Sequence, residues 1–395
     1  MSSKRKAAAP LDDSTSSITV CVRWALSGEV LSVVSLWPGS SVAELLASLP
    51  VERHEVKQLR GVFKGRSLDG TELLATLEGI DVDPEDSFFV VRRPPRLAIL
   101  SSENNTVFWD PEANRRAKSF SFSAHEDSDA RCAAHCVTFS EDASIVLAGY
   151  PQGVARLYTE HGICKKTFTA TARCGSVLAV AISKCGSFCI TGSENGTARV
   201  WSTESGVCLR SMCRHSAPVQ SASLSPDVKL AVTGGCDELA RLWCVKTGQC
   251  LHTLRGHAGV VTCASFAGAD RVVTASFDGS VKVWSCASGD CEITILGHSA
   301  PVLAMAVCPR ADLIFTGCFD GMCKVWGLST GLCSLTLEGH GDAVRSVAIS
   351  QDGQYSLSGD ASGCCKYWSL RSGSCKQTHF LRGDRILNVT LRCPD

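Results

Sequence analysis

The sequence of 395 residues contains 39 Lys and Arg and 39 Asp and Glu, so its formal net charge is zero. This balance argues against a broad electrostatic grip on nucleic acid, which requires clustered basic charge. No apolar run approaches the roughly 18 residues of a membrane span, and the first ten residues lack the apolar stretch of a secretory signal. We therefore expect a cytoplasmic protein that binds neither nucleic acid nor membranes.

Residues 1–16 are small, polar and charged, which is typical of a disordered tail. Three consecutive basic residues, Lys4 to Lys6, make a nuclear location possible, although a solvated tail is the simpler interpretation.

Residues 17–93 have the pattern of a separate small domain. Two apolar runs, at 18–24 and 29–37, flank a Ser-Gly turn and predict a hairpin. A helix is expected at 42–49, where Leu and Val recur at helical spacing, and strands are expected at 59–63 and 87–93. The resulting α+β order, β-β-α-β-β, resembles the ubiquitin-like β-grasp fold.

The ubiquitin resemblance has two implications. Val62, Phe89 and Val91 match the main hydrophobic recognition patch of ubiquitin, so they either form an exposed patch or contact the rest of the chain. The domain ends in Arg92-Arg93 followed by two prolines, not in Gly-Gly, so conjugation to other proteins is not expected. Residues 94–96 are assigned to a linker.

From residue 97 to residue 395 the chain repeats itself about every 42 residues. One repeat predicts four short strands, at 260–267, 271–278, 281–286 and 291–298, with Gly, Asp and Ser at the joints. A period of this length indicates a β-propeller blade. The repeats are marked by one aromatic residue each: Trp109, Tyr158, Trp201, Trp243, Trp284, Trp326 and Trp368.

The two ends of the repeat region complement each other. The first repeat begins at residues 97–102 and lacks an innermost strand, whereas residues 385–395 resemble an innermost strand with nothing after it. Their pairing would close a ring of seven blades and remove exposed strand edges. The fold class is therefore mainly β: a seven-bladed propeller preceded by the small β-grasp domain.

Several repeats carry a His, a Thr, an Asp and a Trp at matching spacings: His257, Thr274 and Asp278 lie 27, 10 and 6 residues before Trp284. This pattern resembles the WD-repeat family, in which a His, a Thr or Ser, an Asp and a Trp form a hydrogen-bonded network within one blade. Such a network satisfies polar groups that would be costly to bury unpaired. In the remaining blades the set is incomplete, because Asn195 and Ser362 replace Asp and Tyr158 replaces Trp. The full set is expected in three blades: His215, Thr233, Asp237 and Trp243; His257, Thr274, Asp278 and Trp284; His298, Thr316, Asp320 and Trp326.

A Thr–His–Asp set also suggests a hydrolase, but here it recurs in several blades and lies outside any Gly-x-Ser-x-Gly context. No phosphate-binding Gly loop occurs. A zinc site requires four ligands at suitable spacing, which Cys132, His135 and Cys136 do not provide. Their pattern predicts part of an innermost strand. We expect no enzyme activity, no cofactor and no metal.

The sequence contains 23 cysteines. Many occupy one recurring position, seven residues after the blade Trp, at the start of a strand. Because equivalent positions in different blades cannot all pair, we expect buried free thiols that act as small hydrophobic residues in a reducing compartment.

In WD-repeat proteins the residue before the network Asp lies on the rim of the central channel. The resemblance places Phe277 and Phe319 there in adjacent blades, preceded by Cys236 and Glu194. Exposed aromatic residues are typical of binding sites. The expected function is a scaffold or adaptor that binds a peptide or protein at this rim.

Two alternatives keep the same fold, namely a ribosome-assembly factor of the Notchless type and an adaptor of the ubiquitin system. A propeller enzyme would need acidic, His or metal-binding residues gathered at the channel mouth, and the repeats do not show them.

Overall fold

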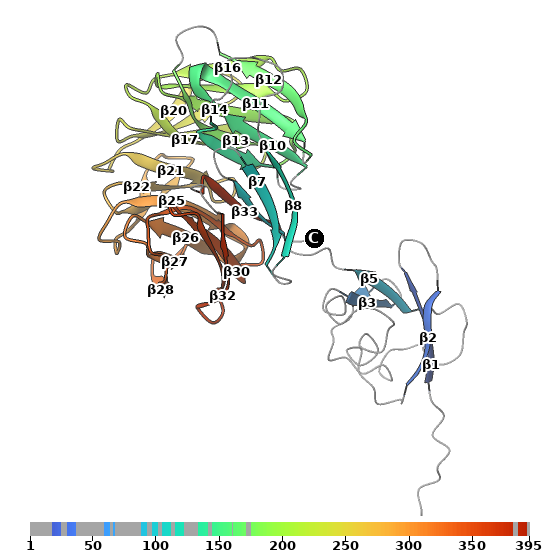
Figure 1. Ribbon diagram of the computed structural model, residues 1–395. Helices are drawn as coiled ribbons and strands as arrows, with labels where there is room; N and C mark the ends of the chain where they lie inside the picture. Colours follow the sequence, from blue (N-terminus) through green and yellow to red (C-terminus); the bar gives the residue numbers. More distant parts are fainter. Residues whose placement is uncertain are drawn as a thin grey trace, which may run out of the picture. The chain divides into compact units, whose positions relative to one another are not determined.

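The chain divides into two compact units, residues 1–95 and 96–393. A computed structural model describes the following residues: 18–24, 30–36, 59–63, 66–67, 88–92, 97–101, 105–111, 115–121, 133–140, 144–159, 161–170, 175–381 and 386–392 (Figure 1). The expected tail (1–16), helix (42–49) and linker (94–96) lie outside these residues.

The first unit contains one five-stranded mixed sheet. In chain order its strands are β1 (Ile18–Trp24), β2 (Val30–Leu36), β3 (Leu59–Phe63), β4 (Arg66–Ser67) and β5 (Phe88–Arg92). The expected hairpin forms between β1 and β2, and the sheet order is β2-β1-β5-β3-β4. Strand β1 runs parallel to β5, whereas the other pairs are antiparallel.

The second unit is built from repeated four-stranded antiparallel sheets, seven of them within its described residues. Three sheets consist of β9 (Cys136–Phe139), β10 (Ile145–Gly149), β11 (Val154–Thr159) and β12 (Cys164–Thr169); β13 (Val177–Ile182), β14 (Phe188–Ser193), β15 (Thr197–Ser202) and β16 (Cys208–Cys213); and β17 (Val219–Leu224), β18 (Leu230–Gly235), β19 (Ala240–Cys244) and β20 (Cys250–Leu254).

Three more sheets follow the same order. They consist of β21 (Val261–Phe266), β22 (Arg271–Ser276), β23 (Val281–Ser285) and β24 (Cys291–Ile295); β25 (Val302–Cys308), β26 (Leu313–Cys318), β27 (Cys323–Gly327) and β28 (Cys333–Leu337); and β29 (Val344–Ile349), β30 (Tyr355–Asp360), β31 (Cys364–Ser369) and β32 (Ser374–Phe380). Among the described residues, two short 3-10 helices connect consecutive strands: η2 (Pro151–Gly153) lies between β10 and β11, and η3 (Pro309–Ala311) lies between β25 and β26. No helix among the described residues has the length and apolarity needed to cross a bilayer.

The remaining sheet joins the two ends of the second unit. Strand β33 (Asn388–Arg392) pairs with β6 (Leu97–Ser101), and β7 (Asn105–Asp110) and β8 (Arg115–Ser121) complete the sheet (Figure 1). The expected pairing of the C-terminal strand with the first repeat is therefore confirmed. The innermost strands β9, β13, β17, β21, β25, β29 and β33 contact one another in sequence, and β33 also contacts β9.

The repeated aromatic residue packs each sheet onto the one before it. Trp326 on β27 belongs to the same buried hydrophobic cluster as Val283 and Ile295 of the preceding sheet, and Trp284 on β23 belongs to that of Val232. The second strand of each sheet is covered on both faces, so it is buried almost throughout, as β22 illustrates. The 42-residue period is therefore also the period of the core.

The cysteines at the start of the outer strands are not buried, which corrects the expectation. Each lies opposite the repeat aromatic at a register shift, as Cys208 lies opposite Trp201, and its thiol donates to the carbonyl two residues ahead, as in Cys333 to Leu335 (3.4 Å). The outer strand has a neighbour on one side only, so its first residue meets solvent. Cys164, Cys208, Cys291, Cys333 and Cys375 are exposed, and Cys250 is half-buried.

Candidate functional site

The expected network is complete in the sheet β17–β20. Trp243 Nε1 donates to Thr233 Oγ1 (2.9 Å), which lies 2.8 Å from Nε2 of His215, and Nδ1 of His215 lies 2.8 Å from Asp237. Arg241 also donates to Asp237 (3.4 Å).

The sheet β21–β24 repeats this geometry. Trp284 donates to Thr274 (2.8 Å), and His257 lies 2.7 Å from Thr274 and 3.1 Å from Asp278. Ala258 N–H also donates to Asp278 (2.8 Å).

The sheet β25–β28 departs from the expected network. Trp326 donates to Thr316 (2.9 Å), and Nε2 of His298 lies 2.7 Å from Thr316. The expected bond from His298 to Asp320 is not formed: Nδ1 of His298 is buried without a partner among the described residues. Asp320 instead accepts from the Met322 N–H (2.9 Å) and is exposed.

A fourth complete network, in the sheet β29–β32, was missed by the sequence analysis. Trp368 donates to Ser358 (2.7 Å), and His340 lies 2.6 Å from Ser358 and 2.7 Å from Asp360. Ser362 was expected to replace the network Asp in this sheet. Asp360, two residues earlier, supplies the carboxylate, and Ser362 donates to it (2.6 Å).

The two sheets before these carry partial versions. Trp201 donates to Thr191 (3.0 Å) without a histidine. Where Tyr158 replaces Trp, its hydroxyl lies 2.8 Å from that of Tyr150.

A glycine precedes three of the network histidines, His257, His298 and His340, whereas Arg214 precedes His215. Gly297 has φ of 155°, and a Cβ at this position would lie 2.9 Å from the Trp326 ring. Any other residue at position 297 would therefore displace the Trp326 ring, which favours glycine there.

The buried imidazoles are held neutral. Burial lowers the pKa of His215, His257 and His340, although each adjacent Asp raises it in part. Burial, with the Lys324 charge, lowers the pKa of His298 to about 4. Thr233, Thr274 and Thr316 are fully buried, so the hydroxyl of each is enclosed within its sheet.

The four candidate rim residues occupy equivalent turns. The backbone N–H of each donates to a carbonyl just before the innermost strand of its own sheet, as in Phe277 to Val260 (2.9 Å) and Phe319 to Pro301 (2.9 Å). The side chains of Phe277 and Phe319 are 48% and 58% exposed. Glu194 is exposed and accepts from the Ser176 N–H (3.0 Å), whereas Cys236 is half-buried.

A cavity of about 600 Å³ lies among the innermost strands. Phe277 and Cys236 contribute to its wall together with Gln220, Arg345 and His135. Phe319 and Glu194 are not part of the wall among the described residues. The structure thus brings Phe277 and Cys236 to one cavity and leaves Phe319 on the exposed turn of the next sheet.

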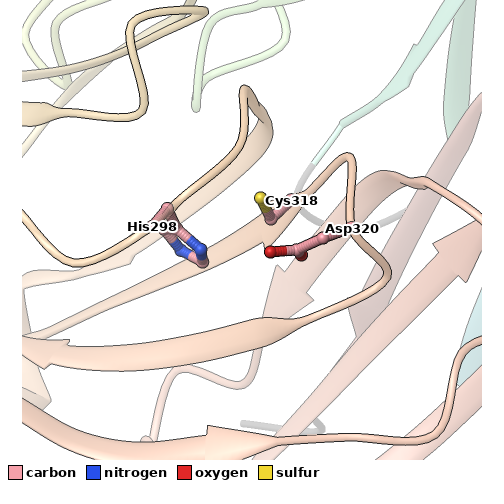
Figure 2. Close-up of side chains that lie close together, drawn as sticks. All are labelled: His298, Cys318 and Asp320. Carbon is pink, nitrogen blue, oxygen red and sulfur yellow. The ribbon is translucent and has the colours of Figure 1, made fainter.

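Metal-ligating side chains gather at two places among the described residues: His298, Cys318 and Asp320 (Figure 2), and His340, Asp360 and Cys364. Neither group was predicted from the sequence. Of the three residues that were considered and rejected as a zinc site, Cys132 lies outside the described residues, His135 is exposed, and Cys136 donates to the Val177 carbonyl (3.5 Å).

In the first unit, Val62 on β3 is the register partner of Phe89 on β5, and Val91 lies two residues further along β5. The three positions expected to form a recognition patch are therefore neighbours in the sheet.

The family model described as "WD domain, G-beta repeat" (WD40) matches residues 162–202, 206–244, 248–285, 289–327 and 331–369. A search of curated proteins gave no significant match. Each matched stretch contains the outermost strand of one sheet and the first three strands of the next, as residues 162–202 contain β12 to β15, and the repeat Trp lies near its end. Residues 162–369 are therefore a run of five WD40 repeats, and the sheets they form are those of a WD-repeat β-propeller.

Proposed function

We propose that this protein is a non-enzymatic scaffold or adaptor that binds a peptide or protein at the rim of its propeller. WD40 repeats generally mediate protein–protein interactions. The observation that carries the proposal is the exposure of Phe277 and Phe319 in equivalent turns of adjacent sheets.

The two rings suit a binding role because they are large, rigid and held by ordered turns. Aromatic anchors dominate interface energies, since they bury much apolar area at little cost in conformational entropy. Phe277 also borders the cavity, where Gln220 and Arg345 offer hydrogen bonds to a bound chain. A segment with an apolar side chain flanked by carbonyl or carboxylate groups fits this combination.

The proposal also includes a seven-bladed ring, a ubiquitin-like domain and a cytoplasmic location for this protein. The seven sheets would close into one seven-bladed ring over residues 97–395, a reading supported by the β33–β6 pairing and the continuous contacts of the innermost strands. The order of the first sheet supports a ubiquitin-like domain at 17–93, since that fold also places its first and last strands side by side and parallel. The cytoplasm is the proposed compartment.

The test uses the full-length protein as bait and a double variant, Phe277→Ala with Phe319→Ala. The variant should retain its melting temperature and lose capture of the wild-type partners, by about 2 kcal/mol or more of binding free energy, as expected for interface hot spots. Ile163→Ala with Leu332→Ala is the matched control, because these side chains are 64% and 71% exposed but lie in other turns.

The possible outcomes separate the alternatives. Early melting of the Phe double variant would make the rings part of the core. Unchanged capture would move the binding site elsewhere. If capture is lost only with Val62→Ala and Phe89→Ala, the adaptor role would belong to the N-terminal unit.

A further inference from the structure

We propose that His298, Cys318 and Asp320 form a zinc-binding site within the sheet β25–β28. One nitrogen of His298, the Sγ of Cys318 and a carboxylate oxygen of Asp320 all lie within 4.8 Å of one another. Figure 2 shows the imidazole facing the other two side chains.

The neighbouring sheets show that both positions can reach the imidazole. Asp278 stands six residues before its Trp and reaches Nδ1 of His257 (3.1 Å), and Asp360 stands eight residues before its Trp and reaches Nδ1 of His340 (2.7 Å). In the sheet β25–β28 both positions carry a metal-ligating group, because Asp320 is six and Cys318 is eight residues before Trp326. Neither forms a hydrogen bond to the histidine: the Cys318 thiol donates to the Ala300 carbonyl (3.3 Å), and Asp320 accepts from the Met322 N–H (2.9 Å). Two potential ligands therefore lie within 4.8 Å of a nitrogen of His298, whose Nδ1 has no hydrogen-bond partner among the described residues.

The protonation state of His298 suits a ligand. The Thr316 hydroxyl donates to the Lys324 carbonyl (3.2 Å), so Nε2–H of His298 donates to Thr316 (2.7 Å) and Nδ1 keeps its lone pair. Metal-binding histidines characteristically donate their other N–H to such a partner, which fixes the ring. A buried nitrogen without a hydrogen bond is costly, and a bound cation would satisfy it.

The donor set favours zinc. Thiolate and imidazole together select Zn²⁺ over Mg²⁺ or Ca²⁺, and the carboxylate is a common third ligand. Zinc–ligand bonds of about 2.0–2.3 Å put tetrahedral ligands about 3.3–3.8 Å apart, so small side-chain rotations close the present spacing. Three protein ligands leave a fourth position for water.

The charges also fit. Zinc binding replaces the S–H proton of Cys318 by a zinc–sulfur bond and releases H⁺ to solvent. Thiolate and carboxylate together neutralise Zn²⁺. The nearby Lys324 ammonium opposes the ion, but it is held by the Gly297 carbonyl (2.8 Å) and lies 5.8 Å from the Trp326 ring centre.

The second metal-ligating group provides an internal contrast. His340, Asp360 and Cys364 have the same three residue types, but Nδ1 of His340 is bonded to Asp360, which also accepts from Ser362. No nitrogen is left free there, and this group is expected to leave zinc unbound.

The experiment titrates full-length protein, stripped with a chelator and fully reduced, with Zn²⁺ in competition with a chromophoric chelator. Co²⁺ is a second probe because one thiolate ligand produces a sulfur-to-cobalt charge-transfer band. We expect one equivalent of zinc in the wild type. Cys318→Ser and Asp320→Asn should each weaken binding at least tenfold, and Cys318→Ser should abolish the cobalt band.

Two controls address other thiols. Cys333→Ser removes an exposed outer-strand thiol of the same sheet, and Cys364→Ser removes the thiol of the second group; both should bind zinc like the wild type. Asp320 is exposed, so Asp320→Asn tests the site even if Cys318→Ser does not fold. Absence of binding at micromolar zinc, or a cobalt band that survives Cys318→Ser or disappears in Cys333→Ser, would overturn the proposal.

Discussion

At the scale of single residues, the networks show that the carboxylate bonded to the histidine can come from either of two sequence positions. Nδ1 of the histidine needs an acceptor, and a carboxylate reaches it from six residues before the Trp in Asp278 or from eight in Asp360. Burial makes this acceptor necessary, because an unsatisfied nitrogen would lose the hydrogen bond that water provides in the unfolded chain. Whether the network forms therefore depends on where the carboxylate and the imidazole lie in space, not on a fixed number of residues between the Asp and the Trp.

Asp278→Asn should lower the free energy of unfolding by about 1–3 kcal/mol, the range for a buried polar group left poorly satisfied. The carboxylate accepts from Ala258, Ser280 and His257, and an amide nitrogen in place of one oxygen can accept none of these bonds. Urea denaturation with a chelator present measures the change. Asp320→Asn is the control and should cost less, since Asp320 makes no bond to His298; equal losses would contradict this account, and lost binding with unchanged stability would make the network a functional site.

At the scale of elements, the outer strands carry a repeated thiol that the inner strands do not. The cysteines at or near the start of β12, β16, β24, β28 and β32 are exposed, whereas Cys189 and Cys323, on inner strands, are buried. Burial raises the pKa of Cys189 and Cys323 to about 12, which keeps these thiols protonated. The same residue type therefore has two reactivities, decided by the strand on which it lies.

A thiol-specific reagent should label the exposed cysteines of the native reduced protein within minutes and the buried ones only on unfolding, because thiolate and access both control the rate. Mass spectrometry of peptides separates Cys208 and Cys375 from Cys189 and Cys323. All 23 thiols should be titratable in denaturant without reductant. Stoichiometric disulfides, or equal labelling of both groups, would be inconsistent with free thiols sorted by strand.

At the scale of the whole molecule, the C-terminal strand holds the first repeat in the array. Strand β33 supplies the innermost strand that β6, β7 and β8 lack. Ile386, Val389 and Leu391 are buried, and the Val389 N–H donates to Ser346 of the preceding sheet (2.9 Å). The strand thus joins sheets that are far apart in sequence.

Deletion of residues 385–395 should lower the melting temperature by about 10 °C or more, or make the protein insoluble. Three buried apolar side chains are lost, each contributing about 1.5–3 kcal/mol, and a strand edge is exposed. Thermal unfolding and the soluble fraction measure the effect. Deletion of residues 393–395, which follow β33, should leave the melt unchanged; an unchanged melt for the longer deletion would mean that β33 does not close the array.

Much of the architecture could be read from the sequence because it depends on repetition. A blade of four strands buries its faces only against another blade, so the same apolar and turn residues recur every 42 positions and reveal the sheets, the C-terminal pairing and the complete networks around Trp243 and Trp284. The exposure of Phe277 and Phe319 also followed from their place in the repeat.

Other features were decided only in three dimensions. The expectation of an Asp six residues before the repeat Trp missed Asp360 and wrongly predicted a bond between Asp320 and His298. A hydrogen bond depends on where two atoms lie in space, which the spacing of residues along the chain does not specify. The outer-strand cysteines looked apolar and proved exposed, because burial depends on whether another sheet covers the strand. The convergence of Cys318 on His298 belongs to the same class: residues 20 positions apart meet there because a loop and a strand end of one sheet are folded together.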